Sequence, residues 1–374
     1  MKLYRLIIII CILPVMELIA QQPSIKIQWE IAGQVTTLGL GGPVAGVYDQ
    51  LLFIGGGSNF PVGPPWEGGT KKYYSQLSVF KREGEKLIAL PITTSLPTEI
   101  AYPATCTTPK GIFYGGGENA TGLTSLAFLM SWDTKTQTPK IESLPSLPEP
   151  ITTATATAIG DKIFLAGGDT KNGTSKKVWY LNLAQLSTGW TAVADLPHAA
   201  SYSIFLTDLT TRKLLLIGGR SKTNSGVSEL LKTVFEFDIA QNRWKPLTEL
   251  PYYLSAGTGV MLEGGDFILF GGERGTTFSQ VERLQQSIAT APDSAQRKKF
   301  VDQKNNLLIH HPGFSRELLR YHKKSKAFEV IGVLPFDTPV TTIACWWGDH
   351  IYIPSGEIKA GVRSPNILSA KIEQ

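Results

Sequence analysis

The chain has little cysteine, little charge and few histidines, and each shortage excludes a class of protein. Only 3 of its 374 residues are cysteine, which excludes a scaffold held together by many disulfides. The five histidines show no metal-ligand spacing, so we expect no metal site; they are His198, His310, His311, His322 and His350. The net charge of +5 is mild and comes without a basic stripe interleaved with aromatics, so we expect no nucleic-acid partner.

Long hydrophobic runs are also missing, except at the N-terminus. Residues 1–20 combine a basic start, an apolar stretch over 6–15 and a small residue at Ala20, which is the pattern of a signal peptide. The apolar run is short for a spanning helix and is broken by Pro14 and Glu17, although an uncleaved anchor is the alternative. We therefore expect a periplasmic or secreted protein that has no membrane contact after cleavage.

Glycine, in contrast, is abundant and periodic. Five apolar runs end in glycine pairs that begin at Gly55, Gly115, Gly167, Gly218 and Gly271, and a sixth, degenerate copy is Ile351-Tyr352-Ile353-Pro354-Ser355-Gly356. A period near fifty residues with this strand end is typical of kelch repeats, which build β-propellers. Six copies predict six blades.

The last interval of the repeat is too long for one blade. It runs from Gly271 to Ser355, and residues 279–306 inside it are polar, charged and rich in helix formers. We therefore predict a helical insertion in the fifth blade.

The sixth blade lacks its final strand at the C-terminal end. The chain stops at Gln374, soon after a predicted strand over 366–372, while a strand-like segment over 25–31 stands unpaired at the other end. Pairing these two strands would close the ring and remove open sheet edges. The prediction is an all-β protein with a single domain over 21–374, a six-bladed kelch β-propeller.

Two cysteines remain after signal cleavage, Cys106 and Cys345. They fall in the second and sixth blades, which are not neighbours, so we expect two buried free thiols and no disulfide.

The loops at one end of a propeller bring residues from every blade into one funnel. The residues after the glycine pairs are candidates for this rim, namely Ser58, Asn59, Glu118, Asn119, Asp169, Arg220, Glu273, Arg274 and Glu357. For any one of them taken alone, a solvated loop residue is the favoured interpretation.

Two loops contain more residues suited to a binding or catalytic site than the other loops of the rim. The loop over 55–74 is long and contains Asn59, Glu67 and Lys72 beside several aromatics, as a lid or pocket wall would. The second loop holds Glu357 and, six residues later, Arg363. A carboxylate can move protons and a guanidinium can bind a carboxylate, but spacing alone favours a simple ion pair on a hairpin.

The 55–74 loop, Gly116-Gly117-Glu118 and the segment from Gly356-Glu357 to Arg363 resemble the cyclically permuted mutarotases. These are kelch propellers related to the bacterial N-acetylneuraminate epimerases, and the resemblance covers nearly all of the mature chain, with a rotated blade order. In the family's Gly-Glu-x-x-x-Gly-x-Arg motif the proposed base falls on Glu357 and its partner on Arg363. The chain departs at Pro354-Ser355, which we expect to weaken the strand and leave the rim intact.

The resemblance implies cofactor-free interconversion of the anomers of N-acetylneuraminic acid, an acidic sugar. Glu357 and Arg363 would be catalytic, and the substrate contacts would come from Asn59, Glu67, Lys72, Glu118, Glu273 and Arg274. The alternative is a non-catalytic propeller that binds glycan or protein. A sialidase is disfavoured because its Ser-x-Asp-x-Gly-x-Thr-Trp boxes are missing. The oligomeric state stays open, a homodimer included.

Overall fold

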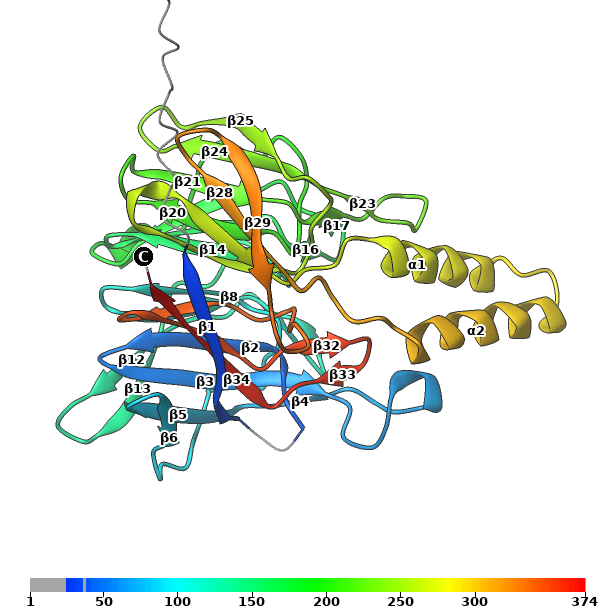
Figure 1. The fold of residues 1–374 in the computed structure, drawn as a ribbon, viewed down its shortest axis with the longest axis horizontal. Helices are drawn as coiled ribbons and strands as arrows, with labels where there is room; N and C mark the ends of the chain where they lie inside the picture. Colours follow the sequence, from blue (N-terminus) through cyan, green and yellow to red (C-terminus); the bar gives the residue numbers. More distant parts are fainter. Residues whose placement is uncertain (1–24, 36–37, 374) are drawn as a thin grey trace, which may run out of the picture.

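The computed structural model describes residues 25–35 and 38–373, so the signal-peptide prediction for residues 1–20 lies outside the described residues. Six antiparallel sheets, each with four main strands, are arranged as the blades of a propeller, which confirms the predicted fold (Figure 1). Each blade is built from consecutive strands, except that the sixth takes one strand from the N-terminus.

The strands of the blades are as follows, from the innermost strand outward. The first blade is β2 (Gly41–Tyr48), β3 (Leu51–Asn59), β5 (Gln76–Glu83) and β6 (Lys86–Ala89), with β4 (Lys72–Tyr73) and β7 (Thr94–Ser95) paired to it; the second is β8 (Ala104–Thr108), β9 (Gly111–Gly115), β12 (Ala127–Asp133) and β13 (Thr138–Ser143). The third is β14 (Thr155–Ile159), β15 (Lys162–Ala166), β18 (Val178–Asn182) and β19 (Thr191–Ala192); the fourth is β20 (Ile204–Asp208), β21 (Lys213–Ile217), β24 (Thr233–Asp238) and β25 (Arg243–Glu249). The fifth is β26 (Thr258–Met261), β27 (Phe267–Phe270), β28 (Glu317–His322) and β29 (Ala327–Val333); the sixth is β30 (Cys345–Trp347), β31 (His350–Pro354), β34 (Asn366–Glu373) and β1 (Lys26–Gln34).

The N-terminal strand closes the ring as predicted. β1 pairs antiparallel with β34, from Lys26 opposite Glu373 to Gln34 opposite Asn366. Figure 1 shows the two strands side by side, with the C-terminus near the start of β1. The first and last described strands therefore lie in one sheet, and the edge of β34 is covered.

The helical insertion is present between β27 and β28 and is longer than predicted. It consists of two helices, α1 (Thr276–Ala289) and α2 (Ser294–Ile309), that project from the propeller as a hairpin (Figure 1). Neither helix contains a buried residue. None of the helices in the described part of the chain is long and apolar enough to cross a membrane.

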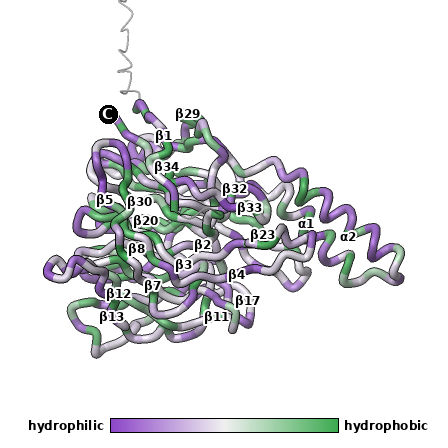
Figure 2. Tube along the Cα trace, turned by 90° about the horizontal axis from the view of Figure 1, so that it is seen from below, coloured by the Kyte–Doolittle hydropathy of each residue, from purple (hydrophilic) through white to green (hydrophobic). Residues whose placement is uncertain are grey.

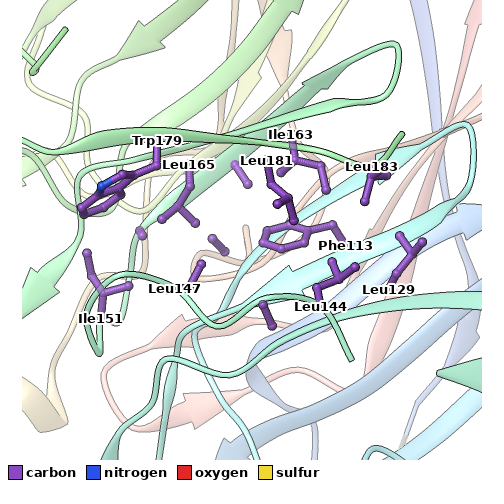
Figure 3. Close-up of a cluster of buried hydrophobic side chains, with 14 residues drawn as sticks. Phe113, Leu129, Leu144, Leu147, Ile151, Ile163, Leu165, Trp179, Leu181 and Leu183 are labelled. Carbon is purple, nitrogen blue, oxygen red and sulfur yellow. The ribbon is translucent and has the colours of Figure 1, made fainter. Parts of the chain in front are cut away.

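The hydrophobic core lies between neighbouring blades. One cluster joins the second and third blades through Phe113, Leu129, Ile163, Leu165 and Leu181, which come from facing strands (Figure 3). In Figure 2 the hydrophobic colour follows the strands of the blades, and α2 is largely hydrophilic. Because each blade buries both faces against its neighbours, the rigid ring can hold loops of very different sequence at its ends.

The glycine pairs join each blade to the next one. In the third blade Gly167 has φ +61°, and a Cβ there would lie 2.0 Å from the carbonyl oxygen of Ala200, which belongs to the segment entering the fourth blade. The N–H of Gly168 donates to the same carbonyl at 2.8 Å. The left-handed pairs in the first two blades are Gly56-Gly57 and Gly116-Gly117, one residue later than the sequence pattern suggested.

The degenerate copy in the sixth blade is stabilised by a side chain. Ser355 takes the left-handed position with φ +56° and is fully buried. Its hydroxyl donates to the carbonyl of Ser364 at 2.7 Å and accepts from the N–H of Leu40 at 2.7 Å. β31 runs to Pro354 beside it, with every residue buried. We find no weakened strand at this position.

The innermost strands surround an axial cavity of about 400 Å³. Its lining includes both cysteines, and the two thiols are free. Cys345 is buried as predicted, and burial raises the pKa of its thiol to about 12. The prediction of a buried side chain is wrong for Cys106, which is partly exposed.

Candidate active site at the mouth of the propeller

A closed ring of backbone hydrogen bonds surrounds one end of the axial cavity. One residue from each blade donates its N–H to the carbonyl of the preceding blade's residue. The six bonds run from Gly42 to Thr341, Tyr102 to Gly42, Thr153 to Tyr102, Tyr202 to Thr153, Ala256 to Tyr202 and Thr341 to Ala256, at 2.8–3.1 Å. We call this end the mouth. The ring fixes the positions of the six blades relative to one another at that end.

Every residue of this ring has a left-handed backbone, with φ between +54° and +64°. The conformation costs a residue with a side chain about 1–2 kcal/mol, and a bulky residue in it is an outlier that often marks a functional site. Two of the six are tyrosines, Tyr102 and Tyr202. At Gly42 a Cβ would lie 2.4 Å from the ring of Tyr102, so glycine leaves Tyr102 room to lie over the first blade.

The rim of the mouth is built from one equivalent position in each blade. Ser58 pairs with Gly41, and isolated β-bridges hold the other five, which are Glu118, Asp169, Arg220, Glu273 and Glu357. In five of the six blades a two-stranded ribbon follows; these are β3–β4, β10 (Glu118–Asn119) with β11 (Gly122–Leu123), β16 (Asp169–Thr170) with β17 (Gly173–Thr174), β22 (Arg220–Ser221) with β23 (Glu229–Leu230), and β32 (Glu357–Lys359) with β33 (Val362–Arg363). In Figure 1 the labelled ribbon strands β17, β23, β32 and β33 lie on the side from which α1 and α2 project.

Glu357 and Arg363 face each other across the β32–β33 ribbon. Nη2 of Arg363 lies 3.2 Å from Oε2 of Glu357, and the N–H of Gly361 donates to Oε1 at 2.9 Å. The Arg363 side chain is 4% exposed. Its Nε and Nη1 are buried without a hydrogen-bond partner among the described residues. A buried donor left unpaired costs about 1–3 kcal/mol, which a bound acceptor would recover.

Phe60 and Tyr102 complete the surroundings of Arg363. The guanidinium carbon lies 4.7 Å from the centre of the Phe60 ring, and Nη2 lies 3.5 Å from the Tyr102 hydroxyl. Trp66, from η1 (Pro65–Glu67), packs against Gly361. The long 55–74 loop therefore forms a wall over the sixth blade.

Glu118 takes part in a second group of charges at the mouth. Its carboxylate accepts from Lys71 at 3.0 Å and from the Tyr73 hydroxyl at 2.9 Å. The ammonium of Lys71 lies 5.1 Å from the centre of the Tyr102 ring. Burial lowers the pKa of Lys71, but Tyr102 and Glu118 outweigh it and hold the pKa above its ordinary value. Lys71 is therefore a fixed positive charge beside the tyrosine.

A second carboxylate–arginine pair lies on the third and fourth blades. Nη2 of Arg220 donates to Asp169 at 2.8 Å, and Lys222 lies 3.1 Å from the same carboxylate oxygen. Burial favours a higher pKa for Asp169, but Arg220, Thr174 and Lys222 together lower it below the ordinary value. Nη1 of Arg220 is buried without a partner in the described chain.

Glu273 occupies the rim position of the fifth blade, where α1 begins. It accepts from the N–H of Gly275 at 2.6 Å and lies 3.9 Å from Nε2 of His311. Burial raises the pKa of Glu273, and burial together with Lys359 lowers the pKa of His311. Both shifts favour the neutral form of the group, which is the protonated carboxyl of Glu273 and the uncharged imidazole of His311.

Four predicted site residues lie in other settings. Asn59 is 4% exposed; its amide donates to the carbonyl of Gly39 and accepts from the Tyr74 hydroxyl. Arg274 forms an ion pair with Glu317 and stacks on Tyr252. Glu67 and Lys72 are exposed on the 55–74 loop, with the Lys72 ammonium over Tyr74. The structure gives Asn59 and Arg274 bracing contacts in place of the predicted position at the mouth.

Tyr102, Tyr202 and Phe278 at the mouth are not among the predicted site residues. A signal for the tyrosines is present in the sequence, because four of the six ring residues stand five positions after the proline of a Leu-Pro pair, as Tyr102 and Tyr202 do after Pro97 and Pro197. Phe278 comes from the insertion, and no pattern in the sequence connects it to the fourth blade.

The axial cavity differs from the mouth in chemistry. None of the described residues that line it is charged, and the carboxylates named above lie on the rim. Within residues 25–35 and 38–373, no three His, Cys, Asp or Glu side chains are arranged to hold a metal ion.

Comparison with known proteins identifies the family of the chain. A protein family described as N-acetylneuraminate epimerase matches residues 144–374, from the end of the second blade through the sixth. The chain belongs to the N-acetylneuraminate epimerase family. The matched part contains Asp169, Arg220, Glu357 and Arg363, so both carboxylate–arginine pairs lie within it.

Individual relatives are more distant. The chain is similar to the N-acetylneuraminate epimerase of Pasteurella multocida (strain Pm70), with 27% identity over 222 residues, 59% of this chain and 57% of the relative. N-acetylneuraminate epimerase 1 of Escherichia coli O6:H1 is 26% identical over 227 residues, 59% of this chain and 58% of the relative. The Haemophilus influenzae (strain PittEE) enzyme is 24% identical over 238 residues, 62% and 60% of the two chains. The matches thus span less than two thirds of these relatives' length, and their names refer to a sugar epimerase.

Proposed function

We propose that this protein interconverts the α and β anomers of N-acetylneuraminic acid by acid–base catalysis without a cofactor. The observation that carries the proposal is the contact of 3.2 Å between the Glu357 carboxylate and the Arg363 guanidinium, which keeps donors without partners among the described residues. In this sugar the carboxylate and the anomeric hydroxyl are attached to the same carbon, C2. A base for the hydroxyl and a cation for the carboxylate must therefore be neighbours.

The proposed reaction moves two protons and breaks one bond. Glu357 removes the proton of the anomeric hydroxyl, the bond between C2 and the ring oxygen breaks, and the ring oxygen gains a proton. The product is an open-chain ketone, which rotates about the C2–C3 bond and closes on its other face by the reverse steps. One carboxylate can serve both transfers, directly or through water, and such catalysis typically contributes about 10²–10⁴-fold.

The surroundings support these roles. The N–H of Gly361 fixes one oxygen of Glu357, so the carboxylate is held in a defined orientation. Lys71 and Arg363 contact Tyr102 while ion-paired with Glu118 and Glu357, so both cations are held in place beside the tyrosine. Nε and Nη1 of Arg363, which have no partner among the described residues, can donate to the carboxylate of an acidic sugar. We also propose that residues 1–20 direct export of the protein to the periplasm or the exterior.

The test follows freshly released α-N-acetylneuraminic acid by proton NMR with and without the purified protein. We expect faster approach to the anomeric equilibrium, and Glu357→Gln should remove about 10²–10⁴-fold of the rate because the amide cannot accept the proton. An unchanged rate in a folded Glu357→Gln variant would contradict the assignment. Binding of the sugar without any acceleration by the wild-type protein would favour the non-catalytic propeller.

A further inference from the structure

The two carboxylate–arginine pairs stand opposite each other across the mouth. Glu357 and Asp169 occupy equivalent rim positions in the sixth and third blades, and these blades are diametrically opposed in a ring of six. Arg363 reaches Glu357 from within the sixth blade, whereas Arg220 reaches from the fourth blade back to Asp169. The mouth therefore has an arginine on each of two opposite sides, which we call its poles.

Each pole has one of the two ring tyrosines beside its arginine. Tyr102 contacts Arg363, and the guanidinium carbon of Arg220 lies 5.0 Å from the centre of the Tyr202 ring. Burial, reinforced by the nearby Tyr102, raises the pKa of the Tyr202 hydroxyl, which keeps it neutral. A ligand that spans the two arginines would therefore have a tyrosine beside each of its ends.

The pole at Arg220 has aromatic side chains on its guanidinium. Phe278, in the first turn of α1, has its ring centre 5.8 Å from the guanidinium carbon, and Tyr202 provides a second aromatic ring. The position of α1 is fixed by Glu282, which accepts from the N–H and the hydroxyl of Ser228 at 2.7 and 2.8 Å. The helical insertion thus supplies one wall of this pole.

Arg220 itself is poised to donate. It is 8% exposed, one nitrogen is bound to Asp169, and Nη1 is buried without a partner in the described chain. Beside these two aromatic rings, an acceptor that carries a methyl group can pair with Nη1 and bury apolar surface at the same time, which a bare carboxylate cannot do.

We propose that Arg220, Tyr202 and Phe278 form a subsite for the acyl-amide group at C5 of the sugar. This inference rests on the proposed function, which places C2 at Glu357 and Arg363. In the six-membered ring of the sugar C5 lies opposite C2, so the amide points to the opposite pole. The amide carbonyl accepts from Arg220, and the methyl group packs on Phe278 and Tyr202.

The experiment measures binding as well as catalysis, so that the two proposals can fail separately. Dissociation constants are measured by calorimetry for N-acetylneuraminic acid and for its analogue with a hydroxyl in place of the C5 acetamido group. The proteins are the wild type, Arg220→Lys, which keeps a charge beside Asp169, and Phe278→Ala. Matched controls are Arg243→Lys, exposed on β25 of the fourth blade, and Phe300→Ala in the middle of α2.

We expect the wild type to prefer the acetamido sugar by about tenfold or more, and each subsite variant to lose most of that preference. Affinity for the hydroxyl analogue should change by less than about twofold, and the control variants should behave as the wild type does. Equal weakening for both sugars, an unchanged preference, or no binding of either sugar would overturn the subsite. Normal binding preference with no anomerisation would overturn only the catalytic proposal.

Discussion

Single residues at the mouth combine unfavourable conformations with useful chemistry. Tyr102 and Tyr202 hold left-handed backbones, and Arg220 and Arg363 bury donors that have no partner among the described residues. Each feature costs about 1–3 kcal/mol. The ring of backbone bonds and the packing between blades compensate for these costs, so the strain is concentrated where a ligand would bind.

Arg363→Ala is expected to raise KM for acidic sugars by roughly 10–100-fold with a smaller effect on kcat, because it removes charge-assisted bonds to the carboxylate. The measurement is the rate of anomerisation against substrate concentration. Neutral sugars that bind serve as the comparison, since an equal effect on them would rule out the carboxylate role. Arg243→Ala, on the exposed outer strand β25, is the control.

Asp169→Asn is expected to make unfolding less dependent on acid pH. The pKa of Asp169 is lowered in the folded protein from an ordinary 3.8, so its charge stabilises the fold above that value and the contribution is lost as the pH falls through the folded pKa. At pH 7 the variant should be less stable by about 2 kcal/mol, because the hydrogen bond from Arg220 loses its charged acceptor. Urea titrations from pH 7 to pH 3 should show the unfolding free energies of the wild type and the variant converging. A difference that stays constant with pH would mean that the charge of Asp169 is not its cause.

At the scale of elements, the glycine pairs and the helical insertion have different roles. The pairs bring one blade's strand end against the carbonyl of the next blade, whereas the insertion adds Phe278 to a mouth that the blades already define. The first feature concerns stability and the second concerns specificity.

Gly167→Ala tests the role of the pairs, with Gly160→Ala as the matched control. Both glycines are in the third blade with φ near +60°, but a Cβ at 167 would lie 2.0 Å from a carbonyl oxygen, whereas at 160 nothing lies within 4 Å. We expect losses of about 3–5 kcal/mol at 167 and about 1–2 kcal/mol at 160 in urea unfolding. Equal losses would mean that only the backbone conformation matters at these positions.

At the scale of the whole molecule, the closure between β1 and β34 makes the ring independent of where the chain begins. Lys26 pairs with Glu373, so a short turn could join these residues into a hairpin. Trp29 packs against Phe270 of the fifth blade at 5.7 Å between ring centres, which ties β1 to the core. The propeller should therefore tolerate a rotated blade order.

A circular permutant that joins Glu373 to Lys26 and opens the chain in the 35–40 connection is expected to fold. Its thermal midpoint should lie within about 3 °C of the wild type, because every strand pair is kept. Deleting residues 25–34 should lower the midpoint by roughly 10 °C, since it removes packed side chains and exposes the edge of β34. A permutant as unstable as the deletion would contradict this role of the closure.

Among the residues after the glycine pairs, the sequence predicts some rim positions correctly and misses others by one residue. Glu118, Glu273 and Glu357 occupy rim positions, as their place after the glycines predicts. Asn59 and Arg274 do not. The rim position next to Asn59 is taken by Ser58, and the one next to Arg274 is taken by Glu273. Successive side chains in extended backbone point to opposite sides, so an error of one residue moves a side chain away from the mouth.

The sequence by itself determined the six blades, the closing strand, the place of the insertion and the pairing of Glu357 with Arg363. All of these depend on spacing along the chain, which a regular repeat makes readable. Only the tertiary structure decided that Tyr102 contacts Arg363, that Arg220 binds Asp169, and that Phe278 lies over Arg220. These contacts join different blades, and the closed ring, which has no local signature at any one residue, brings them together.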